Sequence, residues 1–145
     1  GIMNIKIVVI GKIKEKIYQQ RILEYIKWIN QDVKINLTIL KEDSGKKLDQ
    51  KLKPYLHSDN YTICVSEEGS HLSSKQFSKF VFETNQELTF FIGGPDGHPE
   101  MLRKGANSIL SLSKMTLPHE MALLVLTEQI FRAISIQKGS KYHRE

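Results

Sequence analysis

The sequence predicts an α/β fold built on a mainly parallel sheet. Short apolar segments rich in β-branched residues alternate along the chain with segments whose apolar residues recur at helical spacing. We find no internal repeat, low-complexity tract or linker, and no apolar run reaches the roughly 18 residues of a membrane span. With 145 residues, the chain is expected to form one domain over residues 3–145, with Gly1 and Ile2 as a candidate cloning remnant.

The first half of the chain is predicted to supply two strands and two helices. Met3–Ile10 is apolar and β-branched, which indicates a largely buried strand. Apolar residues recur at helical spacing over Lys14–Asn30, which predicts a helix. Apolar and polar residues alternate over Val33–Leu40, which predicts a strand with one face more exposed to solvent. Glu42–Lys53 is charged and predicts a loop that leads into a short helix, which Pro54 ends.

The second half is predicted to supply three strands and three helices. Ser73 or Ser74 is suited to cap the first of these helices, because a serine hydroxyl accepts a hydrogen bond from the backbone of the first turn. In chain order, the expected elements are a strand at Tyr61–Ser66, a helix at Ser73–Phe82, a strand at Leu88–Ile92, a short helix near Glu100–Gly105, a strand at Ile109–Leu112 and a closing helix at Pro118–Lys138.

The closing helix carries more apolar residues than one amphipathic stripe needs. Met121–Leu126 is an unbroken apolar run, and further apolar residues follow it. Such a helix is either buried on several sides within one chain or half buried by a partner subunit. We favour a homodimer, because a domain of this size has a limited interior.

Two strand ends in the last third of the chain predict a ligand pocket. The strand at Leu88–Ile92 ends at Gly93–Gly94, and the strand at Ile109–Leu112 runs into a loop that reaches His119. Ligands of parallel α/β sheets bind outside the carboxyl ends of the strands. The segment Gly93–Gly97 is either a plain tight turn or a place where bare backbone approaches a ligand. It is not a dinucleotide fingerprint, which needs its glycines after the first strand.

The loop after the last strand has two interpretations. Leu112–Leu117 mixes apolar and polar residues and could wrap an adenine, or it is a plain loop in which Thr116 caps the closing helix. A histidine in the position of His119 is commonly a capping or packing residue. Because His119 abuts the predicted pocket, we favour a role in proton transfer.

Composition indicates the cellular compartment and the kind of partner to expect. The net charge of +5 suits a polyanionic partner such as RNA, although plain solubility explains it equally well. Cys64 is the only cysteine, so no internal disulfide forms, and no secretory signal follows Met3. We therefore expect a cytoplasmic protein with no membrane partner. No cluster of histidine, cysteine or acidic residues has the spacing of a metal site, so no metal is expected.

Motifs along the whole chain resemble those of the RlmH (YbeA) family of SPOUT-class methyltransferases. No single motif is decisive, but their order and the YHR ending are specific. The matching segments are MNIKIVVIGKIKEK at Met3–Lys16, IGGPDG at Ile92–Gly97, LSLSKMTLPH at Leu110–His119, LTEQIFRA at Leu126–Ala133 and KGSKYHRE at Lys138–Glu145.

The resemblance implies a fold, a reaction and partners. The fold would be a SPOUT-type α/β knot, with a five- to six-stranded sheet, helices on both faces and a C-terminal trefoil knot. The reaction would be transfer of a methyl group from S-adenosylmethionine to N3 of a pseudouridine in 23S ribosomal RNA, on the assembled ribosome. The protein would act as a homodimer, with 23S rRNA within the ribosome as its macromolecular partner.

The resemblance also implies site residues. The tail residues Tyr142, His143 and Arg144 would act in catalysis with His119, and in dimeric members of the family this tail reaches the partner's site. Val65 stands where the family has leucine, and His98–Pro99 departs from a leucine-rich form, which we interpret as loop variation with little bearing on function. The implied cofactor contacts are Val65, Gly93, Leu112, Ser113, Lys114, Met115, Thr116 and Leu117.

Two other functions compete with this interpretation. A non-catalytic ribosome- or RNA-binding factor would explain the basic charge but not the predicted small-molecule pocket. A SPOUT methyltransferase acting on transfer RNA would use the same cofactor on a different substrate. The short chain and the YHR ending favour the ribosomal substrate.

Overall fold

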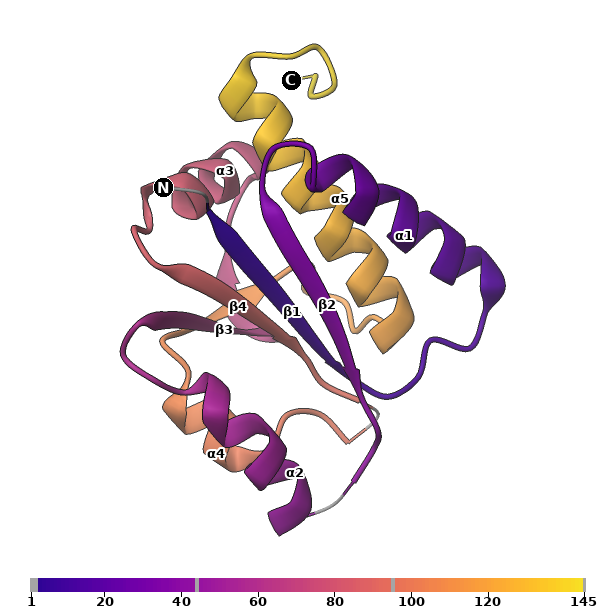
Figure 1. The fold of residues 1–145 in the computed structure, drawn as a ribbon, viewed down its shortest axis with the longest axis vertical. Coiled ribbons are helices and arrows are strands. Elements are labelled where there is room, and N and C mark those ends of the chain that lie inside the picture. The colour runs from indigo at the N-terminus through magenta and orange to yellow at the C-terminus, as the bar shows by residue number, and fades with distance from the viewer. Residues whose placement is uncertain (1–2, 44, 95, 145) are drawn as a thin grey trace.

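The computed structural model describes residues 3–43, 45–94 and 96–144, and it forms a sheet covered by helices on both faces (Figure 1). Within the described residues the sheet has five strands in the order β2-β1-β4-β3-β5, and every neighbouring pair is parallel. The predicted parallel sheet is therefore confirmed. The strands are β1 (Asn4–Ile10), β2 (Lys34–Leu40), β3 (Asn60–His71), β4 (Glu87–Ile92) and β5 (Ser108–Ser111).

The helices divide between the two faces of the sheet. The larger apolar core lies between one face and three helices, which are α1 (Lys16–Ile29), α3 (Ser74–Glu83) and α5 (His119–Lys138). The smaller core lies on the other face, beneath α2 (Lys46–Leu52), the 3-10 turn η1 (Lys53–Tyr55) and α4 (Glu100–Gly105). Figure 1 shows α2 and α4 together, away from α1 and α5.

Strand β1 explains why the first apolar run is continuous. Successive side chains of a strand point to opposite faces, and Ile5, Ile7 and Val9 pack in the larger core while Val8 and Ile10 pack in the smaller one. All five are buried, because β1 lies inside the sheet between β2 and β4.

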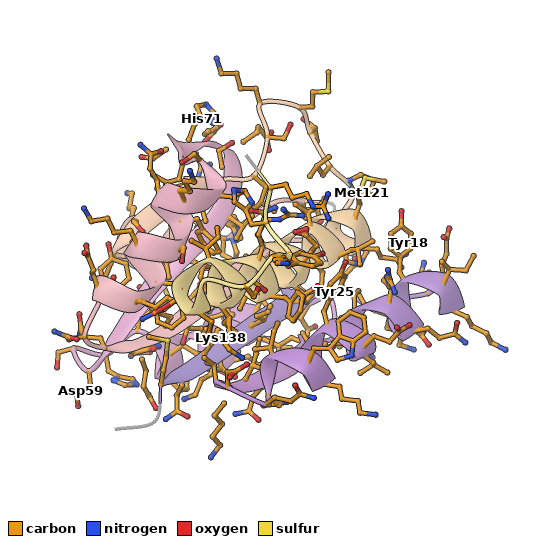
Figure 2. All side chains as sticks on the ribbon, turned by 90° about the horizontal axis from the view of Figure 1, so that it is seen from above. Tyr18, Tyr25, Asp59, His71, Met121 and Lys138 are labelled. Carbon is orange, nitrogen blue, oxygen red and sulfur yellow. The ribbon has the colours of Figure 1, made fainter. Side chains whose placement is uncertain are left out.

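Helix α5 is buried on several sides within the chain. Leu123, Leu126 and Ile130 are fully buried, and the helix packs against both α1 and α3. Figure 2 labels Met121, in the first turn of this helix, and Lys138, its last residue. Leu124 and Val125 are only half-buried, so one apolar edge of the helix remains accessible. The described part of the chain contains no helix that is both long and apolar enough to cross a membrane.

Strand β3 is longer than predicted. The prediction ended it at Ser66, where the apolar alternation stops, but it continues to His71. Its register with β5 shifts between Val65 and Ser70, and both residues pair with Leu110. Gly69 lies so close to β5 that a Cβ there would sit 2.5 Å from the Ile109 carbonyl carbon. Backbone pairing therefore extends a strand whose side chains no longer alternate.

The two predicted caps have different outcomes. Ser73 caps α3, since its hydroxyl accepts from the Gln76 backbone while the Gln76 side chain accepts from the Ser73 backbone. Thr116 does not cap α5, and that prediction was wrong. Pro118 is the N-cap residue, and the Thr116 hydroxyl lies 3.4 Å from a carboxylate oxygen of Glu67 instead.

Candidate functional site

A cavity of about 570 Å³ opens at the carboxyl ends of β3, β4 and β5, beside the first turn of α5. Its volume is typical of small-molecule sites. It lies where the two strand ends in the last third of the chain predicted a pocket. Its walls come from the second half of β3 (Val65–Glu68), the glycine turn (Ile92–Gly94, Asp96–His98), Arg103 of α4, the loop before α5 (Leu112, Ser113, Met115–Pro118) and α5 itself (His119, Ala122).

The glycine turn is both a tight turn and a wall of the cavity. The Gly97 backbone donates to the Gly94 carbonyl at 2.9 Å, and Gly97 has a φ of 76°, which favours glycine. A Cβ on Gly93 would lie 2.8 Å from the Gly97 carbonyl carbon, so no side chain fits there. Pro95, which belongs to the predicted turn, lies outside the described residues.

The loop before α5 contributes most of its predicted residues to the cavity. Leu112, Ser113, Met115, Thr116 and Leu117 line it, whereas Lys114 is exposed and is not among the lining residues. The Met115 backbone donates to the Ser113 hydroxyl at 3.0 Å, which gives the loop a fixed turn. The Met115 side chain is 78% exposed and is free to contact a ligand or partner.

The second half of β3 brings acidic residues to the cavity that the sequence interpretation did not assign to the site. Ser66, Glu67 and Glu68 line the cavity next to Val65. Glu68 accepts a hydrogen bond from Arg103 at 2.9 Å. The Glu67–Glu68–Gly69 sequence at a predicted strand end was the available signal, because polar residues at that edge of a parallel sheet face its ligand site.

His98 is a second residue whose role the sequence interpretation missed. Its Nε2 lies 2.8 Å from the Val65 carbonyl oxygen, and the side chain lines the cavity. Burial lowers the pKa of His98 below its ordinary value, and the nearby Arg103 cation acts in the same direction. The neutral imidazole is therefore the stable form at neutral pH. His98 was dismissed as loop variation because nothing local in the sequence shows that it reaches β3.

His119 lines the cavity from the first residue of α5, as predicted. Its Nε2 lies 2.9 Å from the backbone carbonyl oxygen of Lys12, which follows β1. A Cβ on Gly11 would lie 3.4 Å from this nitrogen and 3.2 Å from a carboxylate oxygen of Glu42. The ends of β1 and β2 therefore meet the first turn of α5 beside the cavity.

The tail residues lie away from the cavity of their own chain. Figure 1 shows the C-terminus beyond the far end of α5, a helix of 20 residues and thus about 30 Å long. The Tyr142 ring packs edge-on against Phe131, with centroids 4.8 Å apart, and the Arg132 guanidinium lies 4.8 Å from the Tyr142 ring centroid. Arg132 also donates to Nδ1 of His143 at 3.1 Å. Tyr142, His143 and Arg144 are absent from the cavity lining.

Solved structures share this fold. A probable methylase family protein from Haemophilus influenzae Rd KW20 superposes with a TM-score of 0.61 and 12% identity, over 99% of this chain and 71% of that one. The SpoU methyltransferase AviRb from Streptomyces viridochromogenes, solved with AdoMet, gives a TM-score of 0.51 at 10% identity, over 97% of this chain and 59% of that one. At such low identity, these similarities concern the fold alone.

Sequence comparison identifies the family. Ribosomal RNA large subunit methyltransferase H of Dictyoglomus thermophilum is 39% identical, over 97% of this chain and 99% of the relative. The protein of the same name from Streptococcus sanguinis is 34% identical, over 98% of this chain and 100% of the relative. A family model described as a predicted SPOUT methyltransferase matches residues 3–143. The chain therefore belongs to the SPOUT methyltransferase family, as its motifs predicted.

Proposed function

We propose that this protein is an S-adenosylmethionine-dependent methyltransferase that methylates large-subunit ribosomal RNA. Membership of the SPOUT methyltransferase family supports the reaction class, and relatives named for the ribosomal RNA large subunit support the substrate. The observation that carries the proposal is the cavity formed by Val65, Gly93 and the Leu112–Leu117 loop at the carboxyl ends of three parallel strands.

The residues around the cavity fit S-adenosylmethionine. Val65, Leu112 and Leu117 offer apolar walls for an adenine, and Gly93 leaves bare backbone where a side chain would collide. The carboxylate of Glu67 favours a positively charged ligand, whereas the carboxylate of Glu68 is paired with Arg103. When bound, S-adenosylmethionine supplies a methyl group on a cationic sulfur. The protein's own part is to hold it with apolar walls and backbone groups and to orient it for transfer.

We propose N3 of a pseudouridine in 23S ribosomal RNA as the acceptor. S-adenosylmethionine would supply the methyl group to N3, and a base on the protein would have to take the N3 proton. Because a carbonyl oxygen only accepts, Nε2 of His119 donates to Lys12, which leaves Nδ1 of the neutral ring to accept a proton. His119 is therefore our first candidate for the base that receives the N3 proton. Tyr142 and His143 are the other candidates.

The tail can reach a cavity only through a second chain, so we propose a homodimer with shared sites. In that arrangement Tyr142 of one chain stacks on a base, Arg144 pairs with a phosphate, and His143 forms a hydrogen bond in the partner's site. The accessible apolar edge of α5 supports an interface, since Met121 is 37% exposed and lies beside half-buried Leu124 and Val125. The C-terminal trefoil knot implied by the family resemblance stays a prediction.

We further propose that the substrate is a preformed ribosomal surface in the cytoplasm. The described residues form one α/β unit with no separate RNA-binding module. A protein surface without such a module is better suited to recognise the shape and phosphate positions of a folded RNA than the base sequence of a short free RNA. Methyl transfer from labelled S-adenosylmethionine should therefore be faster to assembled ribosomal particles than to naked 23S RNA. Equal rates on both would refute recognition of the assembled particle.

The first test is calorimetric titration with S-adenosylmethionine. The wild-type protein should bind saturably, and Gly93→Val should abolish binding because a side chain there collides with the Gly97 backbone. Gly105→Ala is the matched control, since only the flexible end of Leu56 lies near its Cβ. Absence of binding by the wild-type protein would remove the methyltransferase proposal's main support.

A further inference from the structure

The imidazole of His98 connects two walls of the cavity. His98 lies at the end of the glycine turn, and its Nε2 is 2.8 Å from the carbonyl oxygen of Val65 on β3. A backbone carbonyl only accepts hydrogen bonds, so Nε2 carries the hydrogen and donates it. The contact spans 33 positions of sequence and is partly buried.

The acceptor is the residue at which β3 changes register. Val65 pairs with Ile92 of β4 and with Leu110 of β5, and pairing with β5 resumes only at Ser70. The intervening residues 66–69 leave the regular ladder, and Ser66, Glu67 and Glu68 form the cavity wall. The position of that wall therefore depends on what holds β3 at Val65.

The second contact to this wall is weaker. Glu68 pairs with Arg103 of α4 at 2.9 Å, but both side chains are more than half exposed. Exposed ion pairs contribute little to holding a structure, because water and salt screen them. Of these two side-chain contacts, the partly buried hydrogen bond from His98 is therefore the stronger restraint on the wall.

The other ring nitrogen of His98 restricts the side chain to one chemical form. Nδ1 is buried and has no hydrogen-bond partner among the described residues. Protonating it would place a charged N–H donor where no acceptor meets it, near the Arg103 cation. The neutral ring, with hydrogen on Nε2, is the only form that both donates to Val65 and avoids this cost.

We infer that His98 is a positioning residue for the S-adenosyl ligand, which holds the Val65–Glu68 wall against the glycine turn at the spacing that binding requires. This inference rests on the proposed methyltransferase function and deepens it. Val65 also pairs with Ile92 of β4, so losing this contact would leave the two strands joined but would release the end of the glycine turn from the carbonyl of Val65 beside the cavity.

The test compares two substitutions at the same position. His98→Leu introduces an apolar side chain of similar bulk that cannot donate, and it should weaken the binding of S-adenosylhomocysteine roughly 3- to 10-fold, the range expected for one hydrogen bond. His98→Gln places an amide N–H near the position of Nε2 and should restore most of the affinity. His57→Leu, at an exposed site outside the cavity, is the matched control and should leave affinity unchanged.

The outcomes distinguish failure of the His98 inference from failure of the proposed methyltransferase function. Affinity is measured by calorimetry and folding by circular dichroism. If the wild-type protein binds and the leucine variant binds equally well, the inference is wrong and the proposed function stands, even if the variant melts earlier. If the wild-type protein does not bind, the proposed function fails. If the leucine variant does not fold, His98→Asn takes its place in the test, because the shorter amide side chain of asparagine cannot reach Val65. Binding by the asparagine variant as tight as that of the wild-type protein would overturn the inference.

Discussion

The imidazole of His119 is hydrogen-bonded to the backbone of Lys12, with Nε2 2.9 Å from the carbonyl oxygen, although 107 positions separate the two residues. The contact ties the segment after β1 to the first residue of α5. It also selects the tautomer, because the nitrogen that faces a carbonyl must carry the hydrogen. The backbone thus fixes which ring nitrogen of the proposed base is available to receive a proton.

Replacing His119 tests this role directly. His119→Ala should lower the rate of methyl transfer roughly 10²- to 10⁴-fold, the usual contribution of a general base. Affinity for S-adenosylmethionine should change little, since the imidazole faces the acceptor in our proposal. Single-turnover transfer and calorimetry measure the two quantities, with His71→Ala, at an exposed site on β3, as the control. Full activity in His119→Ala, His143→Ala and Tyr142→Phe would show that none of the three receives the proton.

Gly11 should tolerate no side chain. Its φ of 106° is strained for other residues, and a Cβ would lie 3.2 Å from Glu42 and 3.4 Å from His119. Gly11→Ala should therefore lower the free energy of unfolding by about 1–3 kcal/mol. Urea unfolding measures this effect. An alanine variant as stable as the wild-type protein would contradict the assigned backbone geometry.

The partly buried imidazole of His98 should make stability depend on pH. Its pKa is lowered in the folded state, mainly by burial, so below the ordinary value of about 6.5 the unfolded chain binds the proton first. Its contribution is complete above about pH 6.5 and is lost as the pH falls from there through the lower pKa of the folded state. Between pH 7.5 and 5, the wild-type protein should lose more free energy of unfolding than His98→Gln. Equal losses in urea titrations would show that His98 titrates normally.

The Tyr142 hydroxyl should ionise at a higher pH than an ordinary tyrosine. Burial, together with a hydrogen bond to Tyr25, raises its pKa to about 12. The unfolded chain loses this proton at lower pH, so the contribution of Tyr142 to stability is present below about pH 10 and is lost as the pH rises toward 12. The difference in tyrosinate absorbance between wild type and Tyr142→Phe should appear near pH 12. A difference near pH 10 would mean that the tail does not pack on α5 in solution.

Cys64 should be unreactive in the folded protein. Its side chain is 0% exposed, Sγ lies 3.6 Å from the Leu102 carbonyl oxygen, and burial raises the pKa of the thiol to about 11. A thiol reagent should therefore react at least roughly 10³-fold more slowly with the native protein than with the unfolded chain, since reaction requires opening of the core. Rapid reaction without denaturant would contradict the burial of β3.

Apolar patterning predicted most of the elements because it reports burial directly. Met3–Ile10 reads as a continuous apolar run since β1 is covered on both faces, and Ser73 was recognisable as a cap because capping is local chemistry. The prediction ended β3 too early, at Ser66. Beyond that residue the strand is held by backbone pairing with β5, which leaves no trace in the side-chain pattern.

The location of the cavity was predictable where its residues follow strands. Gly93 and the Leu112–Leu117 loop were identified because small and polar residues at strand ends mark the ligand edge of a parallel sheet. Glu67 and Glu68 were visible but unassigned, and His98 was set aside. The hydrogen bond from His98 joins residues 33 positions apart, and no spacing rule connects them.

The sequence by itself determined the order of strands and helices, the family and the region that forms the cavity, since all of these follow from local burial patterns and contiguous motifs. Only the tertiary structure decided which distant residues meet: His119 with Lys12, His98 with Val65, and Tyr142 with Phe131 rather than with the cavity of its own chain. These contacts depend on how the strands are ordered across the sheet and where α5 packs on it. That arrangement is set by the sum of many weak contacts, so no single segment of sequence encodes it.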